Sequence, residues 1–130
     1  LKSRVSFVKN VPAGQSISYG AAFTTLKPSR IATIPIGYAD GYTRLYSNKA
    51  RVLINSAIAP VVGNVTMDQI MIDVTDVPGS TNIAEGTEVT LIGNAGNEKV
   101  SADYLASIFD SINYEVLTML KDKIPRVFIY

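Results

Sequence analysis

Short runs of strand-forming residues, separated by turn residues, constrain the fold of this chain more than any other feature of its sequence. Runs rich in Val, Ile, Thr and Tyr predict strands at residues 5–8, 16–19, 30–37, 51–54, 57–62, 69–74 and 87–92. Gly, Pro, Asn and Asp separate these runs at close intervals. Because a closed or nearly closed barrel removes the exposed edges of such strands, we expect a mainly β fold: a small Greek-key-like β-barrel.

The hydrophobic period changes from two to that of a helix only near the C-terminal end. Apolar residues at helical spacing predict one short helix, of about nine residues, capped by Ser101. Val116 and Met119 predict one or two further helical turns, and residues 126–130 a closing strand. Residues 94–97 are interpreted as a turn. The barrel is therefore expected to carry one or two short helices near its C-terminus.

Composition narrows the classes of function. The 130 residues include neither His nor Cys, so the usual ligands of zinc, copper and haem and every His-dependent triad are missing, and no metal site is expected. The net charge of +1 gives no field that would attract nucleic acid. No apolar run approaches the ~18 residues of a membrane span. We expect one cytoplasmic domain, residues 1–130, and, because strand-like sequence follows Leu1 directly, a piece of a longer protein.

Two groups of residues could carry chemistry. Tyr19, Tyr38, Tyr42 and Tyr114 lie beside turns or at the start of a helical segment. They are either amphipathic residues on the rim of the barrel or catalytic phenols, whose pKa near 10 must then be lowered by a nearby charge. The turn that contains Met67 presents successive backbone N–H groups that could bind a carboxylate. The alternative is an ordinary hairpin with a buried Met.

Five strings of residues stand out along the chain: SISYGAAFT at 16–24, IPIGYADGY at 34–42, GNVTMDQIMID at 63–73, INYEV at 112–116 and IPRVF at 124–128. They occur in the order and spacing of the C-terminal domain of alanine racemase, and the resemblance covers essentially the whole chain. It implies a pyridoxal 5′-phosphate enzyme that interconverts L-alanine and D-alanine and supplies D-alanine for peptidoglycan. It also implies a preceding (β/α)8 barrel domain and a head-to-tail homodimer. From the charge and hydropathy above, we expect no nucleic acid or membrane partner.

The resemblance also implies roles for individual residues. Tyr19 is the base that acts on L-alanine, in the active site of the partner subunit, and the opposing base is the cofactor lysine of the barrel domain. Met67 binds the substrate carboxylate through its backbone N–H. Tyr114 binds the cofactor phosphate and limits the pocket to an alanine side chain. Without the lysine, the isolated chain is expected to be inactive. Three further positions match the substrate entrance: Tyr38, Arg44 and Asp68.

Some residues depart from the family pattern. Phe23 replaces a frequent Tyr, Asn64 replaces an Arg found in some members, and Lys123-Ile124 replaces Arg-Val. Loss of an Arg near the entrance should weaken the attraction of an anionic substrate. Asp40 and Arg126 fall within family motifs but are interpreted as structural.

Two other functions remain open at this stage. A serine or broad-specificity amino-acid racemase of the same fold would share most of the motifs. An oligonucleotide-binding β-barrel could stack bases on rim tyrosines, although the balanced charge argues against it.

Overall fold

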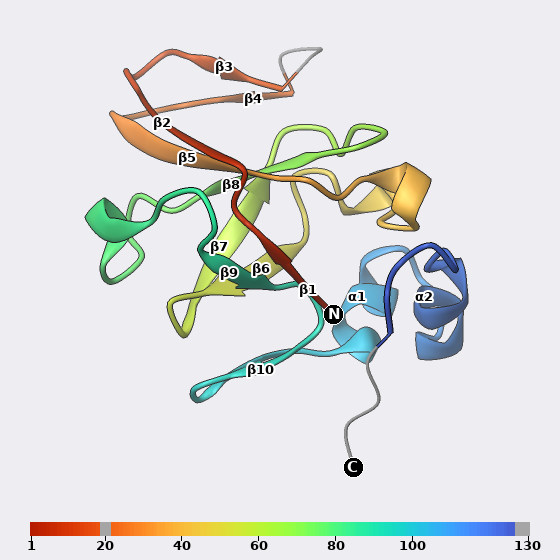
Figure 1. Cartoon of the computed structure of the whole chain (residues 1–130). Helices are drawn as coiled ribbons and strands as arrows, with labels where there is room; N and C mark the ends of the chain where they lie inside the picture. The colour runs from red at the N-terminus through yellow and green to blue at the C-terminus, as the bar shows by residue number, and fades with distance from the viewer. Residues whose placement is uncertain (19–21, 127–130) are drawn as a thin grey trace.

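The fold, a computed structural model, is described for residues 1–18 and 22–126 (Figure 1). Within these residues, short strands are the commonest regular element, and two α-helices follow them: α1 (Ala102–Ile108) and α2 (Asn113–Met119). The described connections contain the 3-10 helices η2 (Tyr38–Asp40), η3 (Arg44–Tyr46) and η4 (Ser80–Asn82). The strands are β1 (Lys2–Arg4), β2 (Phe7–Val11), β3 (Ser16–Ile17), β4 (Phe23–Thr24), β5 (Ser29–Ile34), β6 (Arg51–Ile54), β7 (Ala57–Val62), β8 (Ile70–Asp73), β9 (Glu88–Thr90), β10 (Gly93–Ala95) and β11 (Glu98–Val100).

Seven strands form one curled antiparallel sheet in the order β1-β9-β6-β7-β8-β5-β2. The two edge strands, β1 and β2, are consecutive in the sequence. Between them, the N–H of Val5 donates to the carbonyl of Thr87 (2.9 Å), whereas the N–H of Ser6 donates to that of Thr33 (2.9 Å). One bent segment thus supplies both edge strands of the sheet, which curls into a half-barrel. The predicted mainly β, barrel-like fold with short helices near its C-terminus is confirmed.

Several predicted elements agree closely with the structure. The strands predicted at 51–54 and 57–62 are β6 and β7. Asn55 and Ser56 between them both have positive φ (52° and 59°), as the tight turn of a twisted hairpin requires. β5 ends just before Pro35, which cannot donate to a ladder. Ser101 caps α1, because its Oγ accepts a hydrogen bond from the N–H of Tyr104 (3.0 Å).

Other predicted elements agree with the structure only in part or not at all. Residues 94–97 are not simply a turn, because β10 and β11 form a hairpin in which Ala95 pairs with Glu98. The strand predicted at 5–8 is interrupted where the chain changes from β1 to β2. Arg126 is not in a strand, and the rest of the predicted closing strand lies outside the described residues.

The helices pack against the sheet and against each other (Figure 1). Leu105 of α1 and Val116 of α2 are buried in the same core as the sheet residues. The side-chain amide of Asn113 donates to the carboxylate of Asp103 (2.8 Å), which fixes α2 relative to α1. No helix within the described ranges is long and apolar enough to cross a membrane.

A second, smaller core lies under the hairpin of β3 and β4, which Figure 1 shows away from the two helices. It contains Val11, Ile17, Ile31 and Val62, and Phe23 packs against it. Ile17 is fully buried, so β3 is held firmly immediately before the segment that contains Tyr19.

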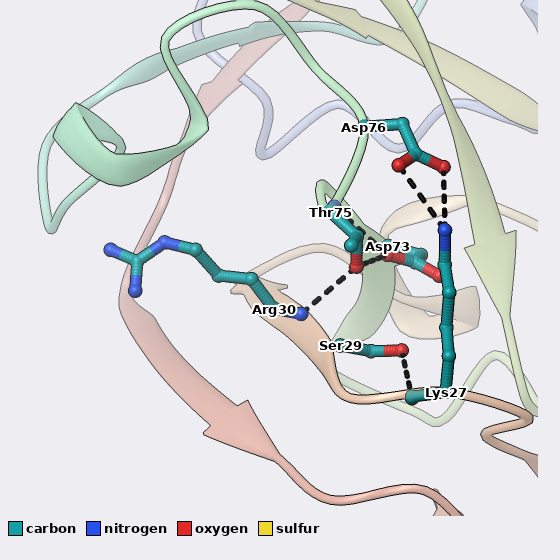
Figure 2. A network of polar contacts seen from close by, with 6 residues as sticks. All are labelled: Lys27, Ser29, Arg30, Asp73, Thr75 and Asp76. Atoms are coloured by element: carbon teal, nitrogen blue, oxygen red, sulfur yellow. Dashed lines mark hydrogen bonds and ion pairs between the residues drawn. The ribbon is translucent and has the colours of Figure 1, made fainter.

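Polar contacts join the start of β5 to the end of β8 (Figure 2). The backbone N–H of Arg30 donates to Oγ1 of Thr75 (2.9 Å), and Thr75 in turn donates to the carboxylate of Asp73. Lys27 forms an ion pair with Asp76 (3.2 Å). The guanidinium of Arg30 points away from this group and donates to the carbonyls of the loop around η4. We interpret this network as structural, because it satisfies backbone groups at the ends of neighbouring strands.

Two tyrosines lie in the core rather than on the rim. Tyr42 is 1% exposed and packs edge-on against Tyr46, with ring centroids 4.6 Å apart. Burial, together with the neighbouring phenols Tyr46 and Tyr104, raises the pKa of Tyr42 far above its usual value. The rim interpretation is therefore wrong for Tyr42, whose phenol stays neutral.

The buried hydroxyl of Tyr42 has no hydrogen-bond partner among the described residues. We expect Tyr42→Phe to raise the free energy of unfolding by about 1 kcal/mol, because the substitution removes a desolvated donor that makes no bond. Urea denaturation of the 130-residue chain measures this. Tyr104→Phe is the control, since its hydroxyl donates to the carbonyl of Lys49 (3.2 Å) and its removal should give no gain. A loss of stability in Tyr42→Phe would contradict the expectation.

Candidate functional site

Two turns that are far apart in the sequence lie against each other. The N–H of Tyr38 donates to the carbonyl of Thr66 (3.0 Å), and the N–H of Ala39 donates to that of Met67 (3.0 Å). Gly37 permits this approach, because a Cβ at that position would lie 2.3 Å from the oxygen of Thr66. The structure thereby brings together three predicted site residues, Tyr38, Met67 and Asp68.

The turn at residues 66–69 is closed by the side chain of Thr66. Its Oγ1 donates to the carbonyl of Gln69 (3.0 Å) and accepts from the N–H of Gln69 (3.1 Å). The N–H of Met67 donates to no other group of the described chain. The side chain of Met67 is 56% exposed, so the alternative of a buried Met is wrong. The turn therefore offers a free backbone donor at the protein surface.

Asp40 holds the other turn in shape. Its Oδ2 accepts a hydrogen bond from the N–H of Gly37 (3.1 Å), and its Oδ1 lies 2.9 Å from Nζ of Lys123. Partial burial acts to raise the pKa of Asp40, but the hydrogen bonds from Lys123 and Gly37 and the ammonium charge together hold it below its usual value. The carboxylate is thus ionised at neutral pH, and the structural interpretation of Asp40 agrees with these contacts.

The end of α2 is attached to the same turn. The N–H of Lys121 donates to the carbonyl of Asp40 (3.1 Å), and a Cβ on Gly41 would lie 2.1 Å from the oxygen of Met119. The helix that begins with Asn113 and Tyr114 is therefore fixed, at its other end, to the turn that carries Tyr38.

Tyr114 is 72% exposed in the first turn of α2. Its phenol makes no hydrogen bond with another described residue. The side chain lies beside a surface hollow between α1 and α2 that Asp103 and Ser111 also line. No hydrogen bond or ion pair links Tyr114 to Tyr38 or Met67 within the described residues, so the structure does not place it directly in their cluster.

Arg44 is the first residue of η3, a short helix capped by Thr43, whose Oγ1 accepts from the N–H of Leu45 (3.2 Å). Its guanidinium is exposed and forms no ion pair with any residue that the structure describes. It is therefore available to an anion from solution. Tyr19, the predicted base, lies outside the described residues.

Sequence reasoning missed Asn48, which joins two segments that are distant from each other in the sequence. Its side-chain amide contacts the backbone of Ala22 and of Gly63. In the sequence, this contact is indicated only by the turn-forming pair Ser47-Asn48. The signal is weak, because Asn is common in turns.

Acidic side chains do not gather into a metal site in the described parts of the chain, where no group of three or more could bind an ion. The contact between the two turns brings the free backbone N–H of Met67 next to the turn of Tyr38, and a backbone N–H can donate to a small anionic ligand.

Comparison with known proteins shows what this chain is similar to. The family profile described as "Alanine racemase, C-terminal domain" matches residues 1–128. The alanine racemase of Clostridium novyi is 50% identical over 129 residues, which are 99% of this chain and 33% of that protein. The chain thus spans about a third of the length of such relatives.

Solved structures give the same result. The alanine racemase from Bacillus anthracis with bound L-Ala-P is 42% identical, with a TM-score of 0.89, over 99% of this chain and 32% of the other. The alanine racemase from Bartonella henselae with covalently bound pyridoxal phosphate is 34% identical, with a TM-score of 0.90, over 98% of this chain and 34% of the other. This chain therefore belongs to the family of alanine racemase C-terminal domains.

Proposed function

We propose that residues 1–130 form the C-terminal domain of a two-domain alanine racemase, which interconverts L-alanine and D-alanine in the cytoplasm and supplies D-alanine for peptidoglycan. The domain works with an N-terminal barrel domain and with a second subunit in a head-to-tail homodimer. The observation that carries this proposal is the free Met67 N–H on a turn fixed against Tyr38, in a chain that belongs to this family.

Racemisation needs two bases on opposite faces of the substrate, because one proton leaves the α-carbon and another arrives from the other side. Tyr19 acts on L-alanine and accepts the α-proton at its phenolic oxygen. A phenol accepts a proton only when its pKa is lowered, so Tyr19 requires a cation or strong donors near it in the assembled enzyme. The opposing base is the cofactor lysine of the N-terminal domain, which is not part of this sequence.

Met67 and the entrance residues bind and guide the substrate. The free N–H of Met67 suits one oxygen of the alanine carboxylate, in the way that exposed backbone donors bind anions. Arg44 adds a positive charge that attracts this carboxylate, and Tyr38 lies next to Met67. Asp68 contributes a negative charge that orients the ammonium group of the approaching amino acid.

Pyridoxal 5′-phosphate fits the exposed groups of this chain. The Tyr114 phenol has no partner among the described residues, so it is free to donate to a phosphate oxygen. When bound, pyridoxal phosphate supplies the electron sink that stabilises the charge left on the α-carbon. Tyr114 also restricts the space for the substrate side chain, because a bulky phenol there favours alanine over larger amino acids.

The proposal is tested on the full-length polypeptide that contains this chain. We expect purified protein loaded with pyridoxal phosphate to convert L-alanine to D-alanine, measured by circular dichroism, with kcat/KM at least about tenfold higher than for L-serine. Equal kcat/KM for serine would identify a broad-specificity racemase instead. Absence of racemisation with either amino acid would reject the proposed function.

A further inference from the structure

The peptide group that carries the free N–H of Met67 is held by its carbonyl. That carbonyl belongs to Thr66, and it accepts a hydrogen bond from the N–H of Tyr38 (3.0 Å). The peptide bond is planar and trans, so its N–H and its C=O point in opposite directions. The hydrogen bond from Tyr38 therefore fixes the direction of the Met67 N–H. It also polarises the peptide group, which strengthens that N–H as a donor.

Asp40 holds the turn that provides this hydrogen bond. Its Oδ2 accepts from the N–H of Gly37 (3.1 Å), and its own N–H donates to the carbonyl of Gly37 (3.0 Å). Gly37 packs directly on the turn of Met67, because a Cβ there would lie 2.3 Å from the oxygen of Thr66. The orientation of the Asp40 carboxylate therefore affects the residue immediately before Tyr38.

Lys123 binds the second oxygen of the same carboxylate. Its Nζ lies 2.9 Å from Oδ1 of Asp40. Lys123 lies in a turn that is closed by the N–H of Ile124, which donates to the carbonyl of Lys121 (3.2 Å). The N–H of Lys121 in turn donates to the carbonyl of Asp40 (3.1 Å). The segment after α2 thus contacts both the backbone and the side chain of Asp40.

The carboxylate of Asp40 depends on this partner because little of it reaches water. Its side chain is 20% exposed, whereas the acidic side chains that pair with Lys2 and Lys27 in the described part of the chain are 53% and 84% exposed. A carboxylate that is largely removed from water is unfavourable without a positive charge beside it. If Lys123 is removed, we expect the carboxylate to turn toward solvent and to release the N–H of Gly37.

We infer that Lys123 is a positioning residue for the Met67 N–H and acts through Asp40 and the turn of Tyr38. The inference rests on the proposed function, in which this N–H binds the carboxylate of alanine. Lys123 does not touch the substrate in this scheme. It fixes the direction of a donor, and a hydrogen bond weakens when its donor is misaligned.

The experiment compares Lys123→Met with Lys2→Met in the full-length protein. Methionine keeps an unbranched side chain but has neither the charge nor the N–H groups of lysine. Lys2 is the matched control, because it pairs with Glu88 at 3.0 Å and its side chain is 60% exposed, against 61% for Lys123. Each variant loses one exposed ammonium group, so both should unfold at nearly the urea concentration of the wild type.

We expect Lys123→Met to raise KM for alanine by about three- to tenfold with little change in kcat. The carboxylate is bound in the ground state and in the transition state alike, so a weaker donor acts on KM. Lys123→Arg should keep the KM of the wild type, because a guanidinium also pairs with the carboxylate of Asp40. Lys2→Met should keep both constants.

Amide hydrogen exchange over residues 37–42 reports on the turn without any catalytic step. Every N–H group of this segment donates to another group of its own turn or to the turn of Met67. Exchange should therefore become faster in Lys123→Met, where the turn loosens, and stay unchanged in Lys123→Arg and in Lys2→Met.

Three results would overturn the inference. The first is a KM in Lys123→Met equal to that of the wild type. The second is an equal rise of KM in Lys2→Met, because the effect would then not come from the turn. The third is unchanged amide exchange over residues 37–42 in Lys123→Met. If the wild-type protein fails to racemise alanine, the proposed function is rejected, whereas faster exchange in Lys123→Met still supports the positioning of the turn.

Discussion

Tyr19→Phe in the full-length protein is expected to reduce alanine racemisation by about 10²–10⁴-fold, the usual contribution of a general base. Phenylalanine keeps the ring but has no oxygen to accept the α-proton of L-alanine. The base on the opposite face is unaffected, so exchange of the α-proton of D-alanine in D2O should persist. The variant should therefore separate exchange from inversion, which simple unfolding would not do.

The matched control for this substitution is Tyr104→Phe. Tyr104 lies on α1, where Arg51 stacks over its ring (4.5 Å to the centroid), and its hydroxyl donates to a backbone carbonyl. We expect the control to racemise alanine at the rate of the wild type. Conversion by Tyr19→Phe at a near-normal rate in both directions would show that another group is the base.

Sequence patterns predicted those parts of the fold that depend on local chemistry. The hairpin of β6 and β7 has β-branched strands and a turn of Asn55 and Ser56, so both its period and its turn are visible in the sequence. Ser101 is a hydroxyl side chain immediately before a helical period, which is the usual start of a helix. Each of these signals lies within a few residues of the element that it specifies.

Features that depend on distant contacts were missed or misinterpreted. Residues 94–97 contain turn-forming residues, but Asn94 and Ala95 are extended because β11 pairs with them. Tyr42 follows a turn and looks like a rim residue, yet it is buried and packs on Tyr46 of η3. Burial of an aromatic side chain next to a turn is decided by what packs on it, which the local sequence does not specify.

The site residues came from the resemblance to a family, because no local pattern distinguishes one tyrosine from another as a base. The structure adds how the residues are held: the turn of Tyr38 rests on that of Met67, and Asn48 joins two loops. These contacts join residues whose separation in the sequence is large. Periodicity and turn propensity therefore contain no information about them.

Gly37→Ala tests the contact between the two turns most directly, and we expect it to lower the free energy of unfolding by roughly 3 kcal/mol. A methyl group at this position would lie 2.3 Å from the oxygen of Thr66 and 2.5 Å from the carbonyl carbon of Met67. Both are backbone atoms, which cannot rotate away as a side chain can. The turns must move apart, so we also expect alanine racemisation by the full-length variant to fall.

Gly86→Ala separates this overlap from the conformational cost of replacing a glycine. Gly86 has a left-handed φ of 94° but open space where a Cβ would lie, so its replacement should cost only about 1 kcal/mol of backbone strain. Gly37 has the opposite character: its φ of −153° is extended, and any residue can adopt it. If urea denaturation shows that Gly37→Ala loses no more stability than Gly86→Ala, the two turns are not in contact, and the arrangement of Tyr38 beside Met67 must be abandoned. A larger loss in Gly37→Ala must come from the steric overlap, because its backbone conformation contributes no strain.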